Sequence, residues 1–230
     1  MKRFALVTAL LLVALGAQTV VAAVAPTIYD IQNGVYAAGD TLTVTGTVVA
    51  VRYNGIWVAE APFGAYNGIW VYMGSTTNVP GDIVDVTGVY SEYYGLTELA
   101  AITDGVVTTG TGPVPAPTVL DAATLTADPE PWESCAVTIS DGMHVTETSD
   151  VLGHGYWTCQ MTNGTVVNFD DYFYDDTTVL LGQCYNNATG IWEYTWSAFR
   201  MEPYVDGYPL VDCVVDDQEV SFGDVKSLFR

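Results

Sequence analysis

Short runs of alternating apolar and polar residues follow one another along the chain, separated by Gly, Asn, Asp and Pro. The runs 41–45 and 82–87 alternate with a period of two residues and are rich in Thr, Val and Ile. These residue types favour half-buried strands of a pleated sheet. Apolar periods of the helical kind are short and restricted to residues 119–126 and 222–229. The pattern therefore predicts an all-β fold.

The first 25 residues differ from this pattern. Lys2 and Arg3 precede an apolar stretch over residues 5–17, and residues 20–23 are small, as signal peptidase requires. The stretch is shorter than the roughly 20 apolar residues of a membrane span. We expect residues 1–25 to be a cleaved signal peptide, the alternative being an N-terminal membrane anchor. The mature chain, without a membrane span, is then extracytoplasmic: secreted, periplasmic or on the cell surface.

An internal repeat divides the remaining chain. The segment 55–58 (GIWV) recurs as 155–158 (GYWT), and 87–93 recurs in outline as 189–194. A Pro- and Gly-rich segment lies between the copies and suits a semi-rigid linker. Units of this size can each close a small five-stranded barrel. The expected organisation is domain 1 over 26–112, a Pro-rich linker over 113–117, domain 2 over 118–214, and an acidic tail over 215–230 that ends in a short apolar and basic segment.

The charge is strongly negative, with a formal net value of −21. Loss of Lys2 and Arg3 with the signal peptide leaves four cations against 27 acids, a net charge of −23. Such a field keeps a protein soluble and repels polyanions. It disfavours nucleic-acid binding driven by phosphate contacts, which needs several Lys or Arg side chains.

Four cysteines lie in the second half of the chain. An even number of cysteines in an exported protein predicts disulfides, here two, with three ways to pair them. A zinc site is the alternative, but the chain has no C-x-x-C motif. We expect two disulfides within domain 2, formed by Cys135, Cys159, Cys184 and Cys213.

The first unit resembles the OB-fold module of secreted bacterial nucleases. The resemblance covers the whole unit and rests on segments 27–32, 39–48, 55–58, 68–72, 81–88 and 94–99. The second unit looks like a diverged copy that departs from the family in its cysteines and an acidic loop. The resemblance implies two tandem five-stranded barrels whose exposed face binds oligonucleotides or oligosaccharides. It does not extend to the nuclease domain, for which we expect no room before Arg230.

Residues that could carry catalysis are scarce. The only histidines are His144 and His154, and neither an H-E-x-x-H nor a G-x-S-x-G motif occurs. We therefore expect a non-catalytic protein without a resident cofactor. The densest acidic cluster consists of Asp170, Asp171, Asp175 and Asp176, and crowded carboxylates of this kind can ligate Ca²⁺. Acidic turns on an acidic surface are the alternative.

Aromatic residues are the remaining candidates for binding. Flat rings offer stacking surfaces for bases or sugars. Alternation places each Trp opposite to its neighbours on the strand, so that either the Trp or the neighbours fill the barrel. Arg52 is the only cation between the signal peptide and Arg200, and is the candidate for an anion contact. The candidate ligand-binding residues are Arg52, Tyr53, Trp57, Trp70, Tyr72, Tyr93 and Tyr94.

Two functions follow from these patterns. The first is a secreted, non-catalytic OB-fold protein that binds single-stranded nucleic acid, polysaccharide or another extracellular polymer. The alternative is a structural or assembly module of the cell surface, with surface proteins as partners and no polymer ligand.

Overall fold

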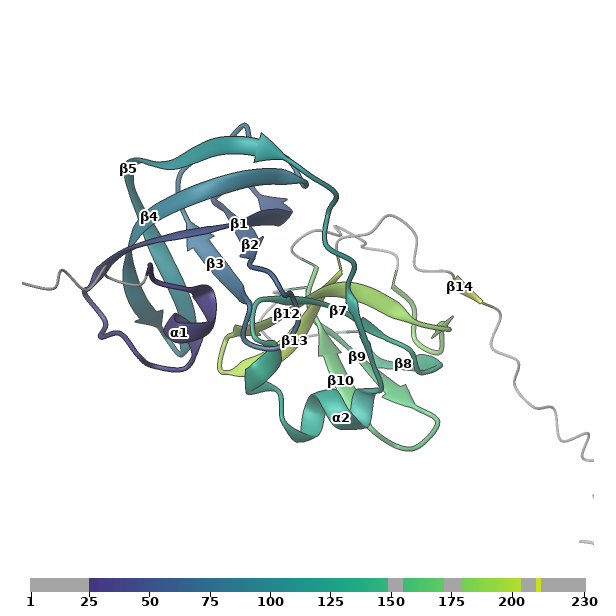
Figure 1. The fold of residues 1–230 in the computed structure, drawn as a ribbon. Coiled ribbons are helices and arrows are strands. Elements are labelled where there is room, and N and C mark those ends of the chain that lie inside the picture. The colour runs from purple at the N-terminus through teal and green to yellow at the C-terminus, as the bar shows by residue number, and fades with distance from the viewer. Residues whose placement is uncertain (1–24, 149–154, 172–178, 204–209, 212–230) are drawn as a thin grey trace, which may run out of the picture.

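The computed structural model describes residues 25–148, 155–171, 179–203 and 210–211, which form two β-rich units (Figure 1). The first unit spans residues 25–111, and the second begins at residue 118. Strands dominate both units, so the prediction of an all-β fold is confirmed. In the part of the chain that the structure describes, no helix has the length and apolar character needed to cross a membrane.

The first unit is a closed barrel. Its strands are connected in the spatial order β1-β2-β3-β5-β4, with β3 and β5 parallel and the other neighbours antiparallel. The runs predicted as strands, 41–45 and 82–87, lie in β1 and β4. The barrel strands are β1 (Thr41–Arg52), β2 (Gly55–Ala59), β3 (Gly68–Tyr72), β4 (Asp82–Tyr93) and β5 (Leu96–Thr111).

Alternation along the strands decides which side chains fill the barrel. In β1, Leu42 and Val44 are buried while the alternating residues Thr41, Thr43 and Thr45 face solvent. In β2 and β3 the barrel interior is lined by Ile56, Val58 and Ile69, together with Val71. Their neighbours on the same strands, Trp57 and Trp70, therefore point away from this core.

A short helix that the sequence pattern did not predict closes one end of the barrel. Helix α1 (Ile28–Gln32) begins after Thr27, whose Oγ1 accepts a hydrogen bond from the backbone N–H of Asp30 at 3.0 Å. Its side chains Ile28 and Ile31 are buried in the barrel core. Five residues are too few to show a helical period in the sequence.

The second unit is built on one sheet. In the described residues its strands follow the order β14-β11-β8-β9-β10-β13-β12-β7-β6. Helix α2 (Ala122–Ala127), capped by Asp121, confirms the short helix expected near residues 119–126. A single 3-10 turn, η1 (Glu130–Trp132), precedes β7. The strands are β6 (Thr118–Leu120), β7 (Cys135–Ile139), β8 (Met143–Glu147), β9 (Trp157–Met161), β10 (Val166–Phe169), β11 (Cys184–Tyr185), β12 (Ala188–Thr195), β13 (Ala198–Pro203) and β14 (Leu210–Val211).

This sheet differs from the expected second five-stranded barrel. The strand that would correspond to β1 of the first unit is interrupted and forms two strands, β7 and β8. Residues 140–142 separate β7 from β8: Ser140 N–H donates to the carbonyl of Leu120 at 2.9 Å, and the Asp141 carboxylate accepts from Ala122 N–H at 2.5 Å. The interruption leaves the described strands as an open sheet. If β7 and β8 are taken as one broken strand, however, the order β8-β9-β10-β13-β12-β7 repeats that of the first unit. The parallel pair, β10 with β13, also occupies the matching place.

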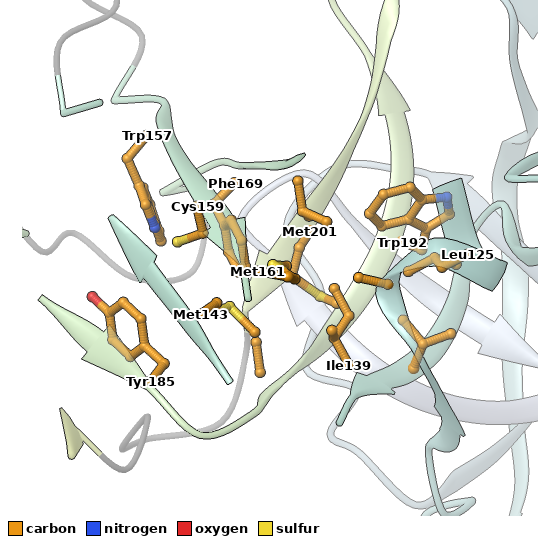
Figure 2. Close-up of a cluster of buried hydrophobic side chains, with 14 of the residues drawn as sticks. Leu125, Ile139, Met143, Trp157, Cys159, Met161, Phe169, Tyr185, Trp192 and Met201 are labelled. Carbon is orange, nitrogen blue, oxygen red and sulfur yellow. The ribbon is translucent and has the colours of Figure 1, made fainter. Parts of the chain in front are cut away.

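The core of the second unit packs between this sheet and α2. Figure 2 shows its side chains, among them Leu125 of α2, Trp157 stacked on Phe169, and three methionines. Cys159 lies in this core and carries a free thiol, as does the buried Cys135. The prediction that all four cysteines form disulfides is therefore wrong: these two pack as small apolar side chains. Cys213 lies outside the described residues, so a disulfide that involves Cys184 and Cys213 stays a prediction.

Candidate functional site

Side chains of the two units meet at a buried contact surface, the junction. On the first unit, Trp57 and Trp70 extend outward from β2 and β3 with their ring centroids 4.3 Å apart. They pack with Leu96 of β5 and with Ile191 of β12, which has no exposed surface. A second part of the junction lies before β7, where the backbone of Ser134 contacts Gly68 so closely that a Cβ at Gly68 has no room.

The two tryptophans are consequently packing residues. Trp57 has no exposed surface and Trp70 is 3% exposed. This corrects the expectation that they present a stacking surface to a ligand. Alternation left open whether these rings or their strand neighbours fill the barrel; the neighbours fill it, and the second unit covers the outer side on which the two rings lie (Figure 1).

The other candidate aromatics remain exposed. Tyr53 lies in the β1–β2 turn and Tyr72 at the end of β3. Tyr93 and Tyr94 lie at the β4–β5 turn, with 61% and 83% of their surfaces exposed and their rings in edge contact at 4.8 Å. Of the six aromatic residues predicted to bind a ligand, the four tyrosines are therefore exposed and the two tryptophans are buried.

The β4–β5 turn has an unusual residue at its tip. Its two central residues, Tyr94 and Gly95, have φ values of +53° and +98°. Two successive positive φ angles are typical of a type I′ hairpin turn, in which Asn, Asp or Gly ordinarily stands first. A bulky aromatic residue in this backbone region is rare and costs free energy.

The β12–β13 turn of the second unit repeats the same arrangement. Its central residues are Trp196 and Ser197, with φ values of +49° and +64°. Trp196 is 59% exposed, so a second aromatic ring extends from a turn position that disfavours it. Sequence analysis did not select Trp196. The repeat could have identified it, because the segments 92–93 and 193–194 are the same Glu-Tyr pair at the two turns.

The two turns lie beside each other. A Cβ built on Gly95 would approach Cε1 of Tyr194, at the end of β12, to 2.7 Å. Tyr194 in turn packs edge-on against Phe199 of β13 with centroids 5.0 Å apart. The exposed rings Tyr93, Tyr94 and Trp196 therefore extend from two hairpins in direct contact; we call these three residues the aromatic turns.

Arg52, expected to contact an anion, is engaged within the protein. Its guanidinium lies 5.3 Å from the ring centroid of Tyr53. It also lowers the pKa of three buried carboxyl groups, those of Asp170, Glu193 and Glu202, although burial raises each of them more strongly. The second arginine of the described residues, Arg200, is 8% exposed, donates to the carbonyl of Thr195 and lies 3.9 Å from the ring centroid of Tyr156.

The acidic cluster expected to bind calcium is only partly described, because Asp175 and Asp176 lie outside the described residues. Asp170 is fully buried, and its Oδ1 accepts from the N–H of Asp171 at 2.8 Å. Burial raises the pKa of Asp170 to about 7 against the opposing effect of Arg200 and Arg52. Within the described residues, no group of three or more His, Cys, Asp or Glu side chains is arranged to hold a metal ion. The neighbouring guanidinium groups compete with a cation, so this geometry does not favour calcium at Asp170.

Comparison with known proteins gives no relative from which a function could be carried over: no family model matches the chain, and no curated protein matches it significantly.

Proposed function

We propose that the chain is a secreted, non-catalytic binding protein made of two OB-fold-like units, and that it binds an extracellular polysaccharide at the aromatic turns. Several observations support the OB-fold-like part of this proposal. The barrel order β1-β2-β3-β5-β4 and its repetition in the second unit agree with the family resemblance of the sequence. The signal-peptide pattern of residues 1–25 supports export.

The backbone at the aromatic turns is the observation that carries the binding proposal. Tyr94 and Trp196 occupy left-handed positions that cost about 1–3 kcal/mol each for a residue other than Gly. Both rings are largely exposed, Tyr94 at 83% and Trp196 at 59%. Residues in unfavourable backbone conformations cluster at functional sites. Rings exposed at the tips of hairpins can stack on the flat faces of sugar residues.

Charge favours a neutral polysaccharide over nucleic acid. The only two Lys or Arg side chains of the described residues, Arg52 and Arg200, lie beside buried carboxyl groups, and Arg200, although it donates to the carbonyl of Thr195 next to Trp196, is only 8% exposed. Phosphate groups would meet an acidic surface with no exposed Lys or Arg side chain of the described residues at the proposed site. The hydroxyl groups of a neutral sugar accept and donate hydrogen bonds without this repulsion. The nearby Glu92 carboxylate, at the end of β4, is exposed and can accept from them.

Affinity gel electrophoresis of the mature full chain tests the proposal. We expect retarded migration in gels that contain a soluble neutral polysaccharide, tested over a panel of α- and β-linked glucans, mannans and xylans. We expect no shift of single-stranded DNA, with or without Ca²⁺ or Mg²⁺. A DNA shift without polysaccharide retardation would instead support nucleic acid as the ligand. If neither polymer is bound at micromolar protein, the binding proposal is wrong.

Substitution at the turns separates binding from stability. Tyr94→Asn and Trp196→Asn place the preferred residue of a type I′ turn at each tip and remove the ring. We expect weaker binding, by roughly 5- to 150-fold if each ring contributes about 1–3 kcal/mol of stacking. The folded chain should be at least as stable as the wild type. Tyr94→Phe, which keeps the ring, is the matched control and should bind normally.

The burial of the β2–β3 face favours a second candidate function. In an OB-fold this face with its flanking loops is the usual binding surface, but here Trp57 and Trp70 pack against the second unit. The two units would then be spacers of a structural or assembly module on the cell surface. Normal binding to a polysaccharide panel argues against this candidate. Loss of surface assembly in cells that produce Trp196→Asn, without polysaccharide binding in vitro, argues for it.

A further inference from the structure

The junction contains carboxyl groups as well as apolar rings. Alternation along β12 places Glu193 on the same face as Ile191, the residue that packs against the two tryptophans. In the register of the hairpin, Ile191 is opposite Glu202 and Glu193 is opposite Arg200. These four side chains therefore form one continuous patch on the face of the second unit that meets the first unit. None of them is more than 8% exposed.

Several carboxyl oxygens of this patch have no hydrogen-bond partner. In the described part of the chain, neither carboxyl oxygen of Glu202 has a hydrogen-bond partner, and neither does Oε2 of Glu193. An ionised carboxylate without partners in a buried site costs several kcal/mol, so such groups keep their protons instead. Burial without hydrogen-bond partners therefore favours the neutral form of Glu202.

The charges that face these groups are acidic in excess. Arg52 of β1 and Arg200 of β13 are the cations that act on Glu193 or Glu202. The acids are Glu98 of β5 and Asp170, which follows β10, with Asp171 next to it. If every carboxyl group in this set were ionised, five negative charges would face two positive ones. Full ionisation therefore makes the closed junction self-repelling.

Another buried acid lies at the other part of the junction. Glu133 is 1% exposed, and its Oε2 accepts from the backbone N–H of Thr97 in the first unit at 3.1 Å. The carboxyl groups that act on it are those of Glu130 and Glu92, and Glu133 itself acts on the hydroxyl of Tyr90 and the thiol of Cys135. Burial, assisted by Glu130 and Glu92, raises the pKa of Glu133 to about 8.

We propose that the junction is a pH-sensitive clamp, which holds the two units together while Glu133, Glu193 and Glu202 are protonated and loosens when they ionise. Burial raises the pKa of Glu193 to about 8 and that of Glu202 well above its usual value. In an open junction these groups return towards the ordinary value of 4.5. The stabilisation of the closed junction by these protonated groups is complete below about pH 4.5 and is lost as the pH rises through about 8.

The clamp connects two features of the molecule. The aromatic turns lie on different units and touch through Gly95 and Tyr194, beside the patch that contains Glu193. Loosening the junction separates the two turns. Weaker polysaccharide binding at high pH follows as a consequence, and that consequence alone rests on the proposed function.

Calorimetry and small-angle X-ray scattering of the mature full chain, without any ligand, test the clamp. We expect one unfolding transition at pH 5, and at pH 8.5 a lower midpoint, two separate transitions and a larger radius of gyration. The closed-to-open equilibrium should change by about tenfold or more between these pH values. A transition and a radius that stay the same from pH 5 to 9 would overturn the proposal. Because the wild-type chain is measured, no variant has to fold for this result to count.

Substitution identifies the groups responsible. Glu193→Gln and Glu202→Gln imitate the protonated acids, and we expect the double variant to lose most of the pH dependence that the wild type shows between pH 5 and pH 8.5, the remainder coming from Glu133. The matched control is Glu147→Gln, the same chemical change at an exposed position of β8. If the double variant follows the same pH dependence as this control, other groups cause the effect and the clamp is not built from these glutamates. Because no polysaccharide is added, a failed binding proposal does not affect this result.

Discussion

Thr97 and Glu133 join the two units directly, because the backbone N–H of Thr97 donates to Glu133 Oε2 at 3.1 Å. Thr97 belongs to the first barrel, whereas Glu133 directly precedes the β7 region of the second sheet. Both residues are buried, Thr97 at 5% and Glu133 at 1% exposure. A single acceptor thus satisfies an N–H group that the covered face of the barrel would otherwise leave without water.

Glu133→Ala should destabilise the protein at every pH. The change leaves the buried N–H of Thr97 without its acceptor, at a cost of about 1–3 kcal/mol. Glu133→Gln keeps an oxygen acceptor and removes the titrating proton. Its free energy of unfolding should match that of the wild type near pH 5 and exceed it at pH 9, as urea denaturation would measure. Equal pH dependence in the Gln variant and the wild type would show that Glu133 does not ionise in the native state.

Trp57→Ala should be among the most destabilising single changes. The ring is fully buried between Trp70 and the second unit, and its loss leaves a cavity that costs about 3–5 kcal/mol. Tyr53→Ala, four residues earlier and 76% exposed, is the control and should change the free energy of unfolding by less than about 0.5 kcal/mol. Denaturant titration followed by circular dichroism measures both. Similar losses for the two variants would mean that the junction contributes little to stability.

Gly95→Ala should disturb the contact between the aromatic turns. Its φ of +98° disfavours any side chain by about 1–2 kcal/mol, and the new Cβ would press on Tyr194. Gly→Ala changes at two other glycines distinguish the backbone cost from the contact with Tyr194. Gly164, with φ of +87° and open space around it, reports the backbone cost alone, and Gly74, with neither feature, should tolerate Ala. We expect the largest loss of thermal stability for Gly95→Ala, a smaller loss for Gly164→Ala and the smallest for Gly74→Ala. Equal losses for the first two would show that Tyr194 moves aside without measurable cost.

Cys135 and Cys159 should be unreactive in the native protein. Both thiols are buried, and burial raises the pKa of each to about 12, so that the reactive thiolate is almost absent at pH 8. Alkylation with iodoacetamide, followed by peptide mass spectrometry, should leave both unmodified in buffer and modify both in denaturant without a reductant. Resistance in denaturant would indicate that they are paired, contrary to the structure.

Much of the first unit could be predicted from the sequence, because period-two alternation directly indicates strands such as 41–45 and the faces they present. The pattern also showed that Trp57 and Ile56 lie on opposite faces of β2. It could not show what covers the outer face, since Trp57 pairs with Ile191, far away in the chain and on another unit. For the same reason the buried state of Glu193 and Glu202 was invisible: acidic residues in a strand ordinarily face solvent.

The cysteine prediction failed for a different physical reason. An even count of cysteines in an exported chain is evidence about the redox environment and not about geometry. Whether two thiols meet depends on the packing of the strands that carry them, and Cys135 points instead to the carbonyl of Gly64, with Sγ and O 3.1 Å apart. The turn residue Trp196 was missed because single exposed aromatics are common, and apart from the repeated Glu-Tyr pair before the turn only its backbone angle distinguishes it.

The parallel strand pairs have a consequence for how quickly the chain folds. In each unit the pair β3–β5 or β10–β13 joins strands that no tight turn connects, and the hairpin strand β4 or β12 comes between them in the sequence. Contacts between distant residues form late, because the entropy of closing the loop must be overcome before they stabilise anything. Each unit should therefore form its hairpins first and its complete sheet last. Hairpin β12–β13 supplies the junction face, so the two units can associate only after this late hairpin has been synthesised and has formed.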